Sequence, residues 1–200
     1  MTEHYYTNQP STEHDFSTFS SELRGKKFTF LTDSGVFSKH RVDYGSQVLI
    51  ETFDPSILPS GTLLDVGCGY GPMGLSFASE VSQVEMIDVN ERSVALAKEN
   101  ALKNHITNAH IHVSYLYDNL LEKEYAGIIS NPPVRAGKKV VTEILTSSFS
   151  LLKKGGALTI VLQKKQGAPS AEKTMKDTFG NVEILKRDKG YYILQSIKME

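Results

Sequence analysis

A twelve-residue stretch constrains the fold of this chain more than any other. It runs Leu-Leu-Asp-Val-Gly-Cys-Gly-Tyr-Gly-Pro-Met-Gly from Leu63 to Gly74. Its apolar start is typical of a buried strand, and its closely spaced glycines are typical of a tight turn that lets backbone approach a ligand. Because a helical pattern follows, the stretch predicts a strand, a glycine-rich turn and a helix N-terminus, an arrangement that binds nucleotides.

From this stretch onward, short apolar runs alternate with helical patterns. The predicted strands are 63–66, 83–89, 109–113, 127–130, 157–162, 182–185 and 191–197. The predicted helices are 72–80, 91–103, 140–152 and 169–179, and Gly155 with Gly156 is expected to end the third of them. Strands that alternate with helices form parallel sheets covered on both faces. The chain therefore predicts a doubly wound α/β fold with a seven-stranded, mostly parallel sheet and an antiparallel last strand.

The first 60 residues precede this alternation. Residues 1–25 are polar, which predicts an N-terminal arm that is irregular to about residue 22. Residues 26–60 predict an extension made of a hairpin and a short helix, and residues 61–200 the main domain. In the hairpin, a strand over 27–31 is expected to turn and return from Val36.

The segment 33–46 has two interpretations. It is either a lid over a bound ligand, with Phe37 as an apolar wall and Asp43 or Gly45 near the ligand, or a packing hairpin that guards the sheet edge. The sequence leaves both open.

Asp88 is a candidate hydrogen-bond acceptor for the ribose of a nucleotide-like ligand. Asp88 ends the second predicted strand of the alternating region, 23 residues beyond Asp65. A carboxylate there accepts hydrogen bonds from both ribose hydroxyls and repels a 2′-phosphate, which disfavours NADP. The glycine spacing also differs from the dinucleotide pattern G-x-G-x-x-G. The alternative is that the glycines only make a tight turn and that Asp88 caps the next helix.

The second anchor is Asn131-Pro132-Pro133, which follows an apolar run. The exocyclic nitrogen of a nucleobase is a weak nucleophile, because its lone pair is delocalised into the ring. An acceptor that holds its N–H stabilises the charge that develops as the nitrogen attacks a methyl group. The Asn131 side-chain oxygen and the Pro132 carbonyl suit two such N–H groups, and the prolines remove competing donors. The alternative is a plain turn, because Asn-Pro is a common turn pair.

These features together resemble the class I S-adenosylmethionine (SAM) methyltransferases. The resemblance covers residues 62–198 and implies a Rossmann-like methyltransferase fold with SAM as the cofactor. It implies that Asp65 and the glycine turn hold the methionine part, that Asp88 holds the ribose, and that Ser114 borders the adenine. The cofactor-binding residues are then Asp65, Gly67, Cys68, Gly69, Gly71, Asp88, Val89, Ser114 and Asn131. The catalytic residues are Asn131, Pro132 and Pro133.

A narrower resemblance concerns the acceptor. Asn-Pro-Pro-Val-Arg-Ala-Gly-Lys from Asn131, with Gly-Val-Phe-Ser and Asp-Tyr-Gly-Ser upstream, is most similar to the bacterial small-subunit rRNA guanine-N2 methyltransferases. The chain resembles their short, single-domain members, which lack a duplicated N-terminal half. This implies a guanine amine of 16S rRNA as acceptor and rRNA or the small ribosomal subunit as partner. Val134 replaces the aromatic residue that commonly follows Asn-Pro-Pro, so stacking on the base must come from elsewhere or be weaker.

Three other functions stay open. The first is the same chemistry on adenine N6 or a protein glutamine. The second is a nucleotide-dependent oxidoreductase, which the glycine spacing opposes. The third is a SAM-binding, RNA-associated factor without turnover.

Any RNA contact has to come from local basic residues, because Lys plus Arg is 22, Asp plus Glu is 23 and the net charge is −1. Such residues cluster in two loops that leave the carboxyl ends of predicted strands: Arg135, Lys138, Lys139, Lys164 and Lys165. Their position predicts phosphate contacts. The alternative is ordinary solvated loop charge.

Composition excludes several other classes. The single cysteine, Cys68, excludes an intrachain disulfide and a cysteine-cluster metal site, and it is interpreted as a small filler of the turn rather than a nucleophile. The six histidines lack the spacing of a helical metal pair, so no metal site is predicted. The polar N-terminus and the short apolar runs predict a cytoplasmic protein without a membrane span. Monomer and homodimer both stay open.

Overall fold

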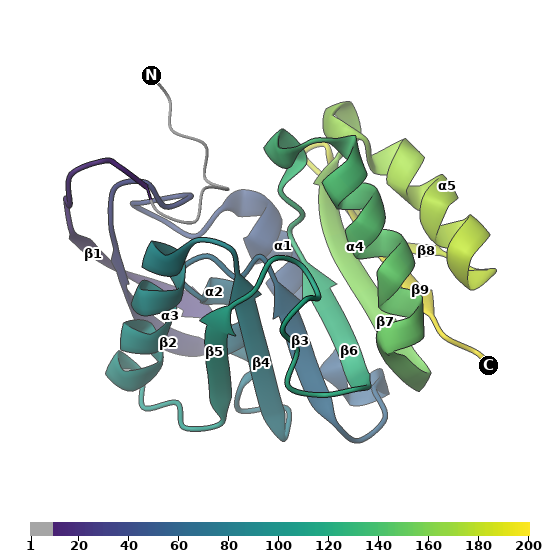
Figure 1. Cartoon of the computed structure of the whole chain (residues 1–200), viewed down its shortest axis with the longest axis horizontal. Helices are drawn as coiled ribbons and strands as arrows, with labels where there is room; N and C mark the ends of the chain where they lie inside the picture. Colours follow the sequence, from purple (N-terminus) through teal and green to yellow (C-terminus); the bar gives the residue numbers. More distant parts are fainter. Residues whose placement is uncertain (1–9) are drawn as a thin grey trace.

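The fold is known from a computed structural model, which describes residues 10–200 (Figure 1). The first nine residues of the predicted arm lie outside the described residues. The expectation of an irregular arm is wrong for Ser17–Leu23, which forms strand β1 and pairs antiparallel with β2 (Lys26–Thr32). The predicted return strand from Val36 is wrong for the same reason: β2 finds its partner earlier in the chain.

A seven-stranded sheet forms the centre of the molecule. Its strands are β3 (Thr62–Val66), β4 (Gln83–Asp88), β5 (Ala109–Val113), β6 (Tyr125–Ser130), β7 (Leu152–Gln163), β8 (Glu183–Asp188) and β9 (Tyr191–Ile197). They lie in the order β5-β4-β3-β6-β7-β9-β8. Neighbours from β5 to β7 are parallel, whereas β9 runs antiparallel to both β7 and β8. The predicted mostly parallel sheet with an antiparallel last strand is confirmed.

Helices cover both faces of this sheet (Figure 1). They are α1 (Tyr44–Thr52), α2 (Pro72–Phe77), α3 (Glu91–Lys103), α4 (Lys138–Leu151) and α5 (Ala168–Phe179), with short 3-10 turns η1 (Pro55–Ile57), η2 (Val134–Ala136) and η3 (Lys164–Gln166). The first three helices and the β1–β2 hairpin pack on one face, and α4 and α5 pack on the other. Leu63 belongs to the first core and Leu64 to the second, because successive strand side chains point to opposite faces. The fold is doubly wound, as predicted.

The glycine pair near the end of α4 has a different role from the predicted one. Gly155 and Gly156 lie inside β7, and α4 already ends at Leu151. Gly155 has a φ of 79°, and its N–H donates to the carbonyl oxygen of Lys198 at 2.7 Å. The pair therefore shapes an irregular entry to β7 and does not cap the helix.

Asn100 of α3 and Asn104, the C-cap of that helix, tie the hairpin to the rest of the fold. The side-chain oxygen of Asn100 accepts from the Leu31 N–H at 2.7 Å, and its amide donates to the Leu31 carbonyl at 2.9 Å. Asn104 makes the same two bonds with Thr29 at 2.9 and 2.8 Å. These side chains satisfy the open edge of β2 as a neighbouring strand would.

The predicted domain division at residues 25 and 60 stays a prediction. Side chains from the hairpin and α1, such as Phe30 and Val48, lie in the same core as Leu63 of the sheet. Within residues 10–200, none of the helices is long and apolar enough to cross a membrane.

Candidate active site

A cavity of about 370 Å³ lies at the edge of the sheet where the parallel strands end. The loops after β3, β4, β5, β6 and β7 line it, because the carboxyl ends of parallel neighbours meet at one edge. Its volume suits a small-molecule ligand. The predicted site residues that line it are Asp65, Gly67, Cys68, Gly69, Asp88, Val89, Ser114, Asn131, Pro132, Pro133 and Arg135.

The glycine turn forms one wall of the cavity. Gly67 and Gly69 have φ of 72° and 56°, a conformation that residues with a Cβ rarely adopt. A Cβ built on either glycine would meet nothing within 4 Å, so both backbones face open space. The N–H groups of Gly67 and Cys68 both donate to the carbonyl of Ile87 at 2.9 Å, which fixes the turn against β4. The turn thus offers close backbone approach to a ligand.

Two carboxylates line the same cavity, one of them buried and the other half-buried. Asp65 is 1% exposed, and its Oδ2 accepts from the Gly74 N–H at 2.8 Å. Asp88 accepts from Gly69 N–H at 2.8 Å and from Asn90 N–H at 2.9 Å. Burial raises the pKa of Asp65 to about 7, with Asp88 adding to the rise, and burial also raises the pKa of Asp88. A cationic ligand would stabilise the ionised forms of both acids.

Cys68 lies in the glycine turn and is 5% exposed. Burial raises the pKa of its thiol well above the ordinary value, and the charges of Asp88 and Asp65 raise it further. The thiolate needed for nucleophilic attack is therefore disfavoured at neutral pH. This agrees with its interpretation as a filler of the turn.

The Asn-Pro-Pro turn forms a second wall of the cavity and begins directly after β6. The Asn131 amide nitrogen donates to Asp43 Oδ2 and to Ser46 Oγ, both at 3.0 Å. Asp43 is also the N-cap of α1, because the same Oδ2 accepts from the Ser46 N–H at 3.1 Å. The Pro132 carbonyl accepts from the Val134 N–H at 2.9 Å, so one of its two lone pairs is occupied.

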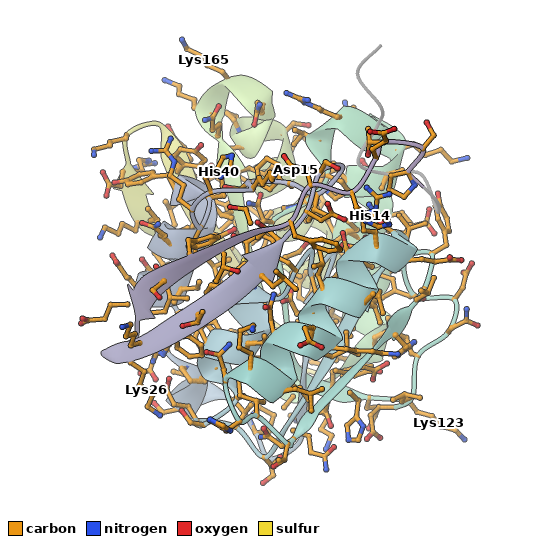
Figure 2. All side chains as sticks on the ribbon, turned by 90° about the vertical axis from the view of Figure 1, so that its left-hand side faces the viewer. His14, Asp15, Lys26, His40, Lys123 and Lys165 are labelled. Atoms are coloured by element: carbon orange, nitrogen blue, oxygen red, sulfur yellow. The ribbon has the colours of Figure 1, made fainter. Side chains whose placement is uncertain are left out.

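Several predicted residues lie outside the cavity wall. Gly71 packs behind the turn, where a Cβ would lie 2.9 Å from a side-chain carbon of Leu75. The basic residues outside it are Lys138 and Lys139 at the start of α4 and Lys164 and Lys165 in η3. Figure 2 shows Lys165 extending outward at the end of the molecule where the parallel strands finish, with Lys26 and Lys123 at the opposite end.

The segment between β2 and α1 also closes over the cavity. Gly35, Phe37, Ser38 and Asp43 line it, whereas Gly45 does not. The Gly35 carbonyl accepts from the Asn90 amide at 3.3 Å, which joins this segment to the start of α3. The contacts favour a cover over the cavity rather than a hairpin on the sheet edge.

Sequence reasoning missed other lining residues, including Gln163, Gln166 and Tyr191. Gln163 ends β7, so the rule that sites form at carboxyl strand ends would have found it. Tyr191 begins β9, and an antiparallel strand places its start at that same edge. Ser46 also lines the cavity and is the last residue of the segment 33–46, but its contact with Asn131 had no signal in the sequence.

Comparison with known proteins agrees with this geometry. The family described as MTS, methyltransferase small domain, matches residues 27–195. The uncharacterized protein YbxB of Bacillus subtilis (strain 168) is 50% identical over 202 residues, covering 100% of both chains. The ribosomal RNA small subunit methyltransferase C of Photorhabdus laumondii subsp. laumondii is 32% identical over 170 residues, covering 82% of this chain and 48% of the relative.

Among solved structures, the T. thermophilus 16S rRNA N2 G1207 methyltransferase (RsmC), in complex with AdoMet and guanosine, matches with a TM-score of 0.83 at 25% identity. The match covers 94% of this chain and 52% of that one. The chain thus spans the full length of YbxB but about half the length of the methyltransferase C relatives. With the family match extending from the hairpin to the last strand, this chain belongs to the methyltransferase small domain family.

Proposed function

We propose that this protein is a SAM-dependent methyltransferase that methylates the exocyclic N2 amine of a guanine in 16S rRNA. The observation that carries the proposal is one cavity with two walls of different chemistry. The glycine turn with the acids Asp65 and Asp88 forms one wall, and Asn131-Pro132-Pro133 forms the other. A cofactor site and an acceptor site that share one cavity are what group transfer requires.

The first wall fits SAM, which is the cofactor of this family. Asp65 lines the cavity beside the glycine turn, and its proposed partner is the cationic methionine end, because a positive charge would stabilise the ionised form of this carboxyl. Asp88 retains lone pairs for the ribose hydroxyls, because the N–H groups of Gly69 and Asn90 bond to different oxygens of its carboxylate. Ser114 and its neighbour Tyr115 line the cavity after β5, on the side proposed for the adenine.

The second wall fits a planar amine. When bound, SAM would supply an electrophilic methyl group, and the sulfonium sulfur would keep the electron pair of the S–C bond. Asn131 Oδ1 accepts one N–H of the attacking amine, and this bond strengthens as positive charge develops on nitrogen. The nitrogen lone pair forms the new N–C bond, and the nitrogen then releases one proton to solvent. Phe37, which lines the cavity and is 49% exposed, supplies the flat apolar surface that Val134 lacks.

The guanine assignment draws on the relatives. Those of which this chain spans about half are named as small-subunit rRNA methyltransferases, and the solved neighbour is a complex with AdoMet and guanosine. Adenine N6 and protein glutamine remain rival acceptors for the same two walls. A substrate in 16S rRNA places the protein in the cytoplasm, where ribosomes assemble.

The decisive experiment measures whether the purified protein transfers a labelled methyl group from SAM to an acceptor. Naked 16S rRNA, small subunits and total protein are the acceptors, followed by ribonuclease or protease digestion. We expect label in RNA that ribonuclease releases, and N2-methylguanosine when the nucleosides are resolved by mass spectrometry. Label in adenosine or in protein would assign a rival acceptor, and SAM binding without transfer to any acceptor would overturn the enzymatic function.

The Asp88→Ala variant tests the cofactor wall. It should bind S-adenosylhomocysteine about tenfold or more weakly, because it loses charge-assisted bonds worth roughly 1.5–3 kcal/mol. Isothermal calorimetry makes the measurement. The exposed Asp177 on α5 gives a matched control, and Asp177→Ala should bind like the parent. An unchanged dissociation constant for Asp88→Ala would remove this residue from the site.

The double variant Lys164→Glu, Lys165→Glu tests the RNA surface. It should weaken RNA binding and reduce the slope of log affinity against log salt concentration by about 1–2. The affinity for S-adenosylhomocysteine (SAH) should stay the same. Filter binding at several salt concentrations measures both quantities. Lys26→Glu with Lys123→Glu changes the net charge equally at the opposite end of the molecule (Figure 2). If both double variants lose the same affinity, η3 makes no particular contact with RNA.

A further inference from the structure

The amide of Asn131 is held in one of its two orientations. Its nitrogen donates one hydrogen to Asp43 Oδ2 and the other to Ser46 Oγ, both at 3.0 Å. Rotating the amide by 180° would place Oδ1 against a carboxylate oxygen, which repels it. Both donors are therefore used on the α1 side, and Oδ1 is the atom left for the cavity that Asn131 lines.

The partners of Asn131 are themselves fixed. Asp43 caps α1 through the Ser46 N–H at 3.1 Å, and Ser46 is 6% exposed. The first turn of α1 packs so tightly that a Cβ on Gly45 would lie 2.7 Å from the Tyr191 ring. The Tyr44 hydroxyl donates to Asp188 at 2.9 Å, which anchors this turn to the β8–β9 hairpin. The start of α1 is thus a rigid support for the amide.

We propose that Asp43, with Ser46, is a positioning residue for methyl transfer: it aims Asn131 Oδ1 at the acceptor amine and increases the negative charge on that oxygen. A carboxylate that accepts from an amide N–H polarises the amide toward its oxygen, as linked hydrogen bonds polarise one another. The oxygen then stabilises the nitrogen better as its positive charge grows. The proposal rests on the function proposed above, because it assigns the same cavity a further residue.

The alternative is a purely structural role, in which Asp43 only caps α1. Serine and asparagine are also good N-caps, so they preserve the helix while they change what Asn131 contacts. Asp43→Ser keeps a cap and removes the carboxylate. Asp43→Asn keeps a cap and an oxygen acceptor but removes the charge. Asp54, the exposed N-cap of η1, provides the matched control as Asp54→Ser, since its side chain accepts from the Ser56 N–H and does not line the cavity.

The first measurement is the single-turnover methyl-transfer rate at saturating SAM and RNA, beside the melting temperature. We expect Asp43→Ser to be about 10- to 100-fold slower than the parent, as misaligned catalytic groups are. Asp43→Asn should be intermediate, and Asp54→Ser should match the parent rate. Melting temperatures and SAH affinities of the two Asp43 variants should stay near those of the parent. A parent-like rate for Asp43→Ser would overturn the positioning role.

A double-mutant cycle gives the sharper test. Asn131→Asp places a carboxylate against Asp43, so its rate should fall below that of Asn131→Ala. In the Asp43→Ser background this repulsion is gone, and the penalty for Asn131→Asp should be at least about tenfold smaller. Equal penalties in the two backgrounds would show that the two side chains act independently and would refute the proposal.

A readout without turnover separates this proposal from the proposed function. In the 15N NMR spectrum, the Asn131 side-chain amide is identified by its loss in Asn131→Ala. Its two hydrogens should be protected from solvent exchange in the parent and exposed in Asp43→Ser. That result with an inactive parent would retain the amide support and reject the methyltransferase function. An active parent whose amide is equally protected in Asp43→Ser would reject the support alone.

Discussion

The Asn131→Ala variant is expected to transfer a methyl group about 10²–10³-fold more slowly than the parent in a single turnover, as when an oxyanion-type hydrogen-bonding group is removed. The amide oxygen matters most when charge develops on the attacking nitrogen. The loss should therefore appear in the rate with both ligands saturating and leave RNA affinity almost unchanged. SAH binding should also survive, because Asp65 and Asp88 belong to β3 and β4 and bond to backbone rather than to Asn131.

Rapid mixing of enzyme, labelled SAM and RNA, followed by acid quench, measures this rate directly. Calorimetry with SAH and filter binding with RNA give the two affinities. A rate near that of the parent would mean that the Asn-Pro-Pro turn is architecture and that the acceptor binds elsewhere. A rate loss matched by an equal loss of RNA affinity would assign Asn131 to ground-state binding instead of the transition state.

The central fold could be predicted from sequence because its signals are local and agree with one another. A run such as Leu63–Val66, followed by glycines and a helical pattern, predicts one strand-turn-helix unit, and repetition of such units predicts a parallel sheet. Topology then brings the carboxyl ends of separate strands to one edge. For this reason Asp65, Asp88 and Asn131 meet in one cavity although Asn131 lies far along the chain from the other two.

The N-terminal errors have a physical origin. β1 is a half-exposed ribbon in which every second residue faces solvent, so its polar sequence predicts an arm. The side chains of Asn100 and Asn104 hold β2 from a helix that begins 59 residues after the strand ends, and single-sequence patterns carry no such pairing. The predicted helix end at Gly155 was wrong for another reason: a glycine with positive φ occurs at the entry to a strand as well as at the end of a helix.

The contacts of Asp43 and Ser46 with Asn131 could not be predicted from the sequence either. The sequence predicts Asp43 near the ligand, and Asp43 does line the cavity, but its bond to Asn131 joins positions 88 residues apart. Ser46 contributes only a hydroxyl in the first turn of a helix, and such serines are usually read as capping or solvent-facing groups. What pairs these side chains is the packing of α1 beside the end of β6, which appears only in three dimensions.

The Asp65→Asn variant should be more stable than the parent at pH 8 when no cofactor is bound. Burial raises the pKa of Asp65 from 3.8 to about 7, so the folded state binds more protons than the unfolded state between these values. Stability from this group therefore falls as pH rises from about 4 to 7. The full difference corresponds to roughly 4 kcal/mol between the protonation states. Asparagine is neutral and can still accept the Gly74 N–H, so it avoids this cost.

The same substitution should weaken the cofactor site. The neutral amide loses the charge partner proposed for the cationic methionine end, so SAH affinity at pH 8 should fall about 10- to 100-fold. Parent affinity should itself decline toward pH 5.5, approaching tenfold per pH unit well below 7, because a cation selects the ionised carboxylate. That decline should be much smaller in Asp65→Asn.

Thermal unfolding at pH 5.5 and pH 8, with and without SAH, tests the predicted stability. Calorimetry with SAH at the same pH values tests the predicted affinity. Without ligand, Asp65→Asn should melt about 5 °C or more above the parent at pH 8, on a scale of about 2–4 °C per kcal/mol. At pH 5.5 the gain should shrink, because the folded parent is then already protonated at Asp65. With SAH at pH 8 the parent should gain more from the ligand than the variant. A variant that melts lower than the parent at pH 8 would show that Asp65 is ionised there at no cost. Unchanged SAH affinity would place the cationic end of the cofactor away from this carboxylate.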